Sequence, residues 1–507
     1  MLDAFGSALT QIFSCPCVGG VIPSRLGFLA IGVFMGLALG VIPGLGGLVG
    51  MALLLPFTYG MDTPAAAAIM MGVLAGVNLG DMVSSVLFAV PGSAASQATI
   101  LDGHPMARKG EAGRAFGAGY TASLMGGIFG VIALSAVLPV MRPIVLAFGA
   151  PEFFMMGIVG ISMVGSLSGR APIKGIIAGA LGLLIGTAGL DPQSGALRWD
   201  FGQLYLWDGI PLVGIALGLF AIPELIDLTI EGTAISSVGM KIGSVWGGVR
   251  DAVKNWFLVL RCSVLGVWIG AVPGLGAPVV DWFAYGHAMQ TEKGAAETFG
   301  KGDVRGVIAV EAAANAKEGG AFIPTIAFGV PGSASMALIL GALLIQGIQP
   351  GPDMVTEHLD LTYVFIITLA LANVLATTVS LLYARQIARI AHIPIHILAP
   401  MLLVVVFLAA FQTSRSVGDL IVLLAFSAIG WMMKRFRWPR PPVILGVVLS
   451  RIIENYLFIS VSRYGWTWLY RPIVMILIVV AVFSIWYGFR AKNKAPSTSE
   501  PSSDSAI

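Results

Sequence analysis

Long apolar segments separated by short polar stretches dominate the chain. A membrane-spanning helix needs about 20 mostly apolar residues, so each segment predicts one membrane helix. The predicted helices lie near residues 24–42, 64–80, 117–140, 143–166, 172–190, 209–228, 257–273, 307–323, 361–384, 395–412, 417–433, 442–461 and 471–489. The pattern therefore predicts an all-α polytopic membrane protein with roughly 12 to 14 membrane segments, some of them half-length.

Two interruptions of these apolar segments occur twice, in the same order. Residues 36–47 read G-L-A-L-G-V-I-P-G-L-G-G, and residues 266–277 read G-V-W-I-G-A-V-P-G-L-G-A. Residues 88–94 then read F-A-V-P-G-S-A, and residues 328–334 read F-G-V-P-G-S-A. Proline and glycine interrupt a helix, because one removes a donor and the other permits unusual backbone geometry. Matching interruptions in two halves predict broken helices or re-entrant hairpins, the best sequence indication of a transporter's binding site.

The duplication divides the chain into repeats and flanking segments. We expect a first repeat over 1–235, an amphipathic connector over 236–256, a second repeat over 257–412, C-terminal membrane helices over 413–490, and a disordered cytoplasmic tail over 491–507. The tail is rich in Ser, Pro and Lys, a composition typical of disordered segments.

Charges in the short loops predict that the two repeats have opposite topology. The loop between the two interruptions is free of Lys and Arg in the first repeat, and it holds Lys293, Lys301 and Arg305 in the second. After the second interruption the bias reverses. The first repeat there holds Arg108, Lys109 and Arg114, and the second holds Asp353, Glu357 and Asp360. Lys and Arg mark cytoplasmic loops, so equivalent loops are predicted to lie on opposite sides of the membrane.

Composition supports a membrane protein and argues against an enzyme. The chain is 57% hydrophobic and 11% charged, with a mean hydropathy of +0.90, whereas globular domains are about 25% charged. Cys15, Cys17 and Cys262 form no metal-ligand spacing, and a proline separates His392 from His396. Neither a phosphate-binding loop nor an H-E-x-x-H motif is present. We therefore expect no nucleotide hydrolysis by this chain, no catalytic residues and no nucleic-acid partner.

The interruptions supply the candidate substrate-binding residues. A broken helix exposes amides and carbonyls at membrane depth, where helix N-termini attract anions and carbonyls hold cations. Hydroxyl groups of the V-P-G-S phrases can donate to a carboxylate. For any single motif, the alternative to a binding site is a helix kink that serves packing alone. The predicted substrate-binding residues are Pro43, Gly44, Gly46, Pro91, Gly92, Ser93, Pro273, Gly274, Gly276, Pro331, Gly332 and Ser333.

Polar residues inside the apolar segments are the candidates for a coupling-ion site, because charges at membrane depth are costly. The set is Asn78, Asp81, Ser84, Ser85, Glu311, Asn315, Glu318 and Thr325. The spacing of Glu311, Asn315 and Glu318 places them on one helical face. Oxygen ligands of this kind suit Na⁺ or a proton relay. The alternative is a structural polar cluster paired with Lys317, and Asp281 is a weaker candidate.

Several phrases together resemble a known family. They are the G-x-x-x-G-x-x-P-G-L-G phrase of both halves, L-D-G-H-P-M-A-R-K-G at 101–110, F-G-K-G-D-V-R-G-V-I-A-V-E at 299–311, and G-G-A-F-I-P-T-I-A-F-G-V-P-G-S at 319–333. With these phrases, the chain resembles the large membrane subunit of the tripartite tricarboxylate transporters, the TctA family. The resemblance covers at least residues 25–350.

The resemblance implies a multi-pass permease of the bacterial inner membrane that imports citrate-like carboxylates or related organic acids. It implies a small TctB-like membrane subunit and a TctC-like periplasmic substrate-binding protein as partners. It also implies secondary transport, with Na⁺ or H⁺ as the coupling ion and no other cofactor. A membrane subunit of a passive or ATP-driven anion uptake system is the alternative, because an external ATPase would need no phosphate loop in this chain.

Overall fold

The structure is a computed structural model of the 507-residue chain. It describes residues 1–13, 17–18, 22–42, 46–93, 96–167, 172–191, 193–231, 242–273, 276–390 and 395–492. Within these ranges the regular structure is almost entirely helical, as predicted. Five described helices are long and apolar enough to cross a membrane by length and composition, or six with one bent pair, Trp246–Lys254 and Trp256–Gly270.

The helices follow one another closely along the chain. The first half contains α1 (Leu2–Phe13), α2 (Ser24–Gly40), α3 (Gly46–Leu54), the 3₁₀ turn η1 (Leu55–Thr58), α4 (Thr63–Phe88), α5 (Thr99–Arg108), α6 (Ala112–Ala147), α7 (Ala150–Leu167), α8 (Pro172–Gly186), η3 (Leu204–Leu206), α9 (Leu212–Ala216), the π-helical turn η4 (Leu217–Ala221) and α10 (Ile222–Glu231). The second half contains α11 (Trp246–Lys254), α12 (Trp256–Gly270), α13 (Gly276–Thr291), α14 (Ala295–Thr298), α15 (Val304–Phe328), α16 (Ala334–Ile345), α17 (Pro352–Val355), α18 (Leu359–Ile390), α19 (Ile395–Phe411), α20 (Val417–Arg435), α21 (Pro441–Tyr464), η5 (Gly465–Tyr470) and α22 (Pro472–Lys492).

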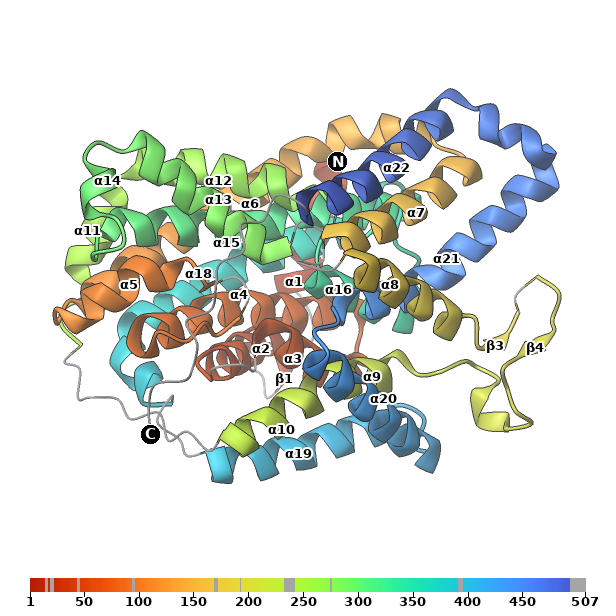
Figure 1. Ribbon diagram of the computed structural model, residues 1–507, viewed down its shortest axis with the longest axis horizontal. Coiled ribbons are helices and arrows are strands. Elements are labelled where there is room, and N and C mark those ends of the chain that lie inside the picture. Colours follow the sequence, from red (N-terminus) through yellow and green to blue (C-terminus); the bar gives the residue numbers. More distant parts are fainter. Residues whose placement is uncertain are drawn as a thin grey trace.

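The strands of the described chain form two short antiparallel pairs. Strands β1 (Cys17–Val18) and β2 (Ile22–Pro23) pair near the N-terminus. Strands β3 (Gly189–Leu190) and β4 (Leu197–Arg198) pair with Gly189 opposite Arg198. In Figure 1 the β3–β4 hairpin projects from one end of the molecule, and α5, α11 and α14 lie at the other.

Each predicted membrane segment falls on helical structure, and the segment at 209–228 is divided into α9, η4 and α10. Two further differences concern α4 and α6. Helix α4 continues past residue 80 to Phe88, so the first V-P-G-S turn follows directly on a long helix. Helix α6 continues through Pro139 and Pro143, where the sequence predicted a boundary between two helices. Both prolines are exposed, and a helix can open slightly at a proline on its outer face without displacing a packed neighbour. Residues 493–507 of the predicted tail lie outside the described residues.

Both P-G-L-G phrases separate two helices. Helix α2 ends at Gly40 and α3 begins at Gly46, and in the second half α12 ends at Gly270 and α13 begins at Gly276. Pro43, Gly44 and Gly274 themselves lie outside the described residues, whereas Pro273 is described and buried.

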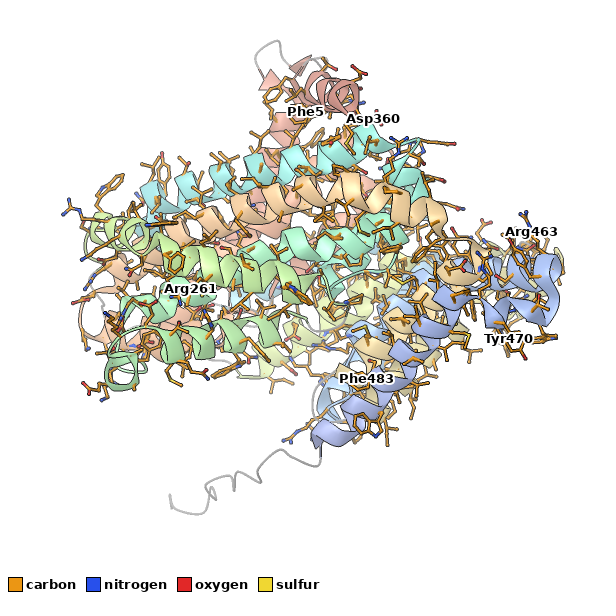
Figure 2. All side chains as sticks on the ribbon, turned by 90° about the horizontal axis from the view of Figure 1, so that it is seen from above. Phe5, Arg261, Asp360, Arg463, Tyr470 and Phe483 are labelled. Carbon is orange, nitrogen blue, oxygen red and sulfur yellow. The ribbon has the colours of Figure 1, made fainter. Side chains whose placement is uncertain are left out.

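The two halves pack against each other crosswise. Helix α2 packs on α4 and α12 packs on α15 within the halves, while α4 also packs on α18 and α15 on α6 between them. These long helices lie side by side along the longest axis (Figure 1). Helices α7 to α10 and α19 to α22 form neighbouring layers in which α21 covers α7 and α8, and α22 covers α7. The views agree that α21 and α22 slant away from the long helices (Figures 1 and 2).

Glycines set the close approach of α2 and α4. A Cβ atom built on Gly36 would lie 2.5 Å from the Val73 carbonyl oxygen, and one on Gly76 would lie 2.5 Å from the Val33 carbonyl oxygen. Gly32, Gly40, Gly72 and Gly80 meet backbone of the opposing helix in the same way. Small residues at this spacing let membrane helices pack backbone to backbone. In the second half, Gly266 and Gly270 of α12 meet the α15 backbone likewise.

Candidate functional site

Both V-P-G-S turns fold back on the helix that precedes them. Helix α4 ends in a left-handed residue at Ala89, and α15 ends in one at Gly329, the matching position. A Cβ atom on Gly92 would lie 2.7 Å from the Asp81 Cα atom, and one on Gly332 would lie 2.7 Å from the Ala321 Cα atom. Each glycine is therefore needed for the backbone of the turn to reach the helix.

The predicted hydroxyl groups hold this turn geometry. The Ser85 hydroxyl donates to the Ser96 carbonyl at 3.0 Å, and the matching Thr325 hydroxyl accepts from the Gly332 amide at 3.2 Å. Ser84 donates to the Asp81 carbonyl at 2.9 Å. Ser333 caps α16 by accepting from the Met336 amide at 3.3 Å, while Ser93 interacts with Asp81.

Asparagine side chains join four helices beside the first turn. The Asn315 amide on α15 donates to the Ser123 carbonyl on α6 at 2.9 Å and to Asn373 Oδ1 on α18 at 2.8 Å. Asn78 on α4 donates to Asn315 Oδ1 at 3.4 Å. Asn78 and Asn315, predicted from separate segments, are thus brought together at the centre of the crosswise packing.

Three buried carboxylates lie next to this amide network. Asp81, Glu311 and Asp281 are at most 3% exposed. Glu311 Oε1 accepts a hydrogen bond from the Thr99 hydroxyl at 2.7 Å. Asp281 accepts none from any side chain of the described chain, and it interacts with the backbone of Gln97, just after the first V-P-G-S turn. The charges of Asp81 and Glu311 both act on Asp281.

Lys317 supplies a positive charge to the cluster. Its Nζ atom lies 2.7 Å from Glu318 Oε1, and both side chains are buried. Lys317 also acts electrostatically on Asp81 and Asp281, and it packs against Gly270, where α12 ends before the second P-G-L-G phrase. We call Asp81, Asp281, Glu311, Lys317 and Glu318 the buried charge cluster. If fully ionised it would hold four negative charges and one positive charge.

The cluster lies where the first V-P-G-S turn meets the second P-G-L-G break. Asp281 is on α13, which follows that break, and Trp282 beside it donates to Gln97 Oε1 at 3.4 Å. The sequence placed Asp281 among the weaker candidates and Lys317 only as a pairing partner. Signals for both were present, since each is a charge inside an apolar segment.

No group of three or more His, Cys, Asp or Glu side chains that could hold a metal ion occurs in the described part of the chain.

Two of the quoted sequence phrases contact each other at the end of the molecule that holds α5 and α14. Asp102 Oδ1 accepts from the Gly302 and Asp303 amides at 2.8 Å each, and Tyr285 donates to Asp102 Oδ2 at 2.9 Å. Lys109 Nζ donates to the Lys301 carbonyl at 2.6 Å. Helix α5 and Lys109 follow the second interruption of the first half. They thus contact the loop that lies between the two interruptions of the second half.

The opposite end shows the reciprocal contact. Gln346, after α16, donates to the Thr58 carbonyl at 2.8 Å and accepts from the Thr63 hydroxyl at 2.9 Å. Gln346 follows the second interruption of the second half. It thus joins that segment to the turn that lies between the two interruptions of the first half.

Acid should loosen the β3–β4 hairpin. Arg198 pairs with Asp191 at 2.8 Å and with Glu454 of α21. The Ser194 hydroxyl, the Gln193 amide and the Arg198 charge hold the pKa of Asp191 below its ordinary value of 3.8. The stabilisation is thus complete above pH 3.8 and is lost as the pH falls through the lower folded-state pKa. We expect backbone hydrogen exchange of residues 193–200 to accelerate only below about pH 4, with Asp200→Asn as the control that leaves this behaviour unchanged.

The fold defines a multi-pass helical membrane protein, and the buried charge cluster lies in its interior. A family model, "Tripartite tricarboxylate transporter TctA family", matches residues 26–445. The chain belongs to this family, and it is a membrane component of a tripartite tricarboxylate transporter system. The family consists of transporter components that work with other subunits, and it is not an enzyme family.

Two relatives from Agrobacterium vitis match the chain. One, described as "Uncharacterized 52.8 kDa protein in TAR-I ttuC' 3'region", is 30% identical over 436 residues, which cover 86% of each chain. The other, "Uncharacterized protein in TAR-II ttuC' 3'region", is 29% identical over 192 residues, which cover 38% of this chain and 79% of the relative. No solved structure matches the chain significantly.

Proposed function

We propose that this chain is the large permease subunit of a binding-protein-dependent secondary transporter. It imports citrate-like carboxylates or related organic acids across the bacterial inner membrane, driven by a Na⁺ or H⁺ gradient. The observation that carries this proposal is the buried charge cluster, because acids outnumber cations in it. Buried excess charge is costly unless it is neutralised, so the cluster favours a state that has taken up a cation.

The crosswise contacts support two inverted repeats. If the halves had the same topology, equivalent loops would lie at the same end. Instead Asp102 and Lys109 contact the 301–303 loop at one end, and Gln346 contacts the 58–63 turn at the other. With α3, α5, α13 and α16 counted as half-length segments of re-entrant hairpins, this arrangement fits roughly 12 to 14 membrane segments.

Substrate and ion then bind at the same junction. The P-G-L-G and V-P-G-S tips offer amides and hydroxyls to substrate carboxylates, and Lys317 adds a positive charge beside the second P-G-L-G break. Asn78, Asp81, Glu311, Asn315 and Glu318, together with Asp281, hold the coupling ion. Binding of a cation lowers the negative charge near Lys317 and so favours the entry of an anion, which couples the two.

The proposed partners are a TctB-like small membrane subunit and a TctC-like periplasmic protein that delivers the substrate. The decisive experiment is uptake of labelled carboxylates by proteoliposomes that contain this chain and its small subunit. The binding protein is outside, and Na⁺ and pH gradients are imposed separately at clamped voltage. Accumulation above equilibrium under one gradient supports the proposal and identifies the ion. Equilibration only, or a requirement for ATP, would instead identify a passive or ATP-driven system.

A further inference from the structure

A large cavity lies away from the buried charge cluster, between α16 and the layer formed by α8 and α21. Its volume is about 820 Å³, within the range of small-molecule sites. The C-terminal end of α8, the segment that leads into α9, the middle of α21, and α16 with the segment after it line the cavity. Its walls are mostly apolar, and its charged lining residues are Asp208 and Arg451.

Arg451 differs from the arginines around it. Arg198 pairs with Asp191 and Glu454, and Arg471 pairs with Glu152. Arg451 is exposed and forms no ion pair within the described ranges, and it donates only to the Asp208 carbonyl, at 3.1 Å. A guanidinium carries five N–H donors, so most of those on Arg451 remain available to an anion.

The charges that flank α8 and α21 favour an external position for the cavity. At the other end of α8 and α21, Lys174 donates to the Phe436 carbonyl, Lys434 pairs with Glu224, and Arg440 lies at the start of α21. These cations mark the cytoplasmic side. The cavity lies at the opposite end of both helices, next to the β3–β4 hairpin that projects from the molecule (Figure 1).

We propose that this cavity, which we call the outer cavity, is an external receiving site for the substrate, with the Arg451 guanidinium binding a carboxylate group. The inference rests on the proposed function, since it takes the transported solute to be a carboxylate. The outer cavity touches the segment directly after α16, the helix that follows the second V-P-G-S turn. An acid held there is next to the re-entrant arm that leads to the deeper site.

The test measures occupancy without requiring transport. In a chain whose three cysteines are replaced by serine, Gln349→Cys places a thiol on the exposed wall of the outer cavity. A membrane-impermeant thiosulfonate should label it from outside in sealed proteoliposomes. Citrate, succinate and benzoate are tested in turn, with chloride as the control anion. At a concentration of ten times its Kd, a bound acid should slow labelling about 11-fold.

Arg451→Gln should abolish this protection while the unprotected labelling rate stays unchanged, and Arg451→Lys should restore part of it. Arg463→Gln is the matched control, because Arg463 lies on the same helix outside the outer cavity and should leave protection intact. Protection should also persist in Asp281→Asn, which is expected to lose gradient-driven accumulation, so that failure of this inference is distinguishable from failure of the proposed function.

Three results would overturn the proposal. The thiol at position 349 could fail to react from outside, which would show that the outer cavity does not open there. It could react without protection by any of the three acids. Protection could also depend on anionic phospholipid in the vesicles and vanish in purely zwitterionic ones, which would assign Arg451 to a lipid headgroup.

Discussion

Asp281→Asn is expected to abolish gradient-driven carboxylate accumulation and to leave the chain folded and inserted. Asp281 is fully buried, and the charges of Asp81, Glu311 and Lys317 act on it. Asparagine has nearly the same shape, and loss of one of several buried like charges removes repulsion, so folding should not suffer. A cation held there loses a charged partner, which costs about 3–5 kcal/mol for a buried pair. Accumulation should therefore fall at least about 100-fold.

The measurement separates ion coupling from substrate binding. Uptake driven by an ion gradient should be lost, while exchange of labelled for unlabelled substrate at equal ion concentrations on both sides should persist in part. Asp251→Asn is the control, because Asp251 pairs with Arg114 near the surface and exposed pairs contribute little. Gradient-driven accumulation within twofold of wild type in Asp281→Asn would remove the cluster from the coupling mechanism.

The two halves share the framework of the site and differ in its charges. Ser85 and Thr325 match, and so do the turn glycines Gly92 and Gly332, which pack on the preceding helix in the same way. Asp81, however, matches Ala321. The repeated features are those that shape the backbone, whereas the buried carboxylates lie around one turn, the first V-P-G-S. In the proposed mechanism, the repeated backbone features form the scaffold and the coupling ion binds at the first turn.

The sequence allowed the helices to be predicted well, because about 20 apolar residues in a row determine a membrane helix locally. It also predicted the helix breaks at the P-G-L-G phrases, since Pro and Gly act on their own backbone, whereas the break expected between residues 140 and 143 was wrong, because α6 continues there. Helices α3, α5, α13 and α16 were not predicted as separate elements, because each is shorter than the roughly 20 residues of a membrane span. The contacts of α4 with α18 and of α15 with α6 followed only from the structure.

Prediction of the site was also limited, because contacts between distant helices do not follow from local sequence patterns. Asn78 and Asn315 were identified as polar residues in apolar segments, but their direct contact depends on the tertiary packing. Asp281 and Lys317 come from different helices, and no local pattern indicates that they lie near each other. Arg451 has no feature in the sequence that separates it from Arg463; its position in the lining of the outer cavity and its hydrogen bond to the Asp208 carbonyl do so.

Gly36→Ala and Gly27→Ala should change stability in opposite directions, although both lie on α2. Alanine favours a helix over glycine by about 1 kcal/mol. A Cβ atom on Gly27 meets nothing within 4 Å, so that substitution should be neutral or stabilising.

A Cβ atom on Gly36 would lie 2.5 Å from the Val73 carbonyl oxygen and 2.9 Å from the Val73 Cα atom. These are backbone atoms that no rotamer change can move, so α2 and α4 must separate. Overpacking of this kind costs about 1–3 kcal/mol, and separation of these helices would also displace Asn78 and Asp81 on α4. Thermal unfolding in detergent, followed by size-exclusion chromatography, should give a lower midpoint for Gly36→Ala than for wild type and an unchanged or higher one for Gly27→Ala. Equal midpoints for the two variants would mean that α2 and α4 are not held together by backbone contact, and the packing that positions the buried charge cluster would have to come from α6, α15 and α18 instead.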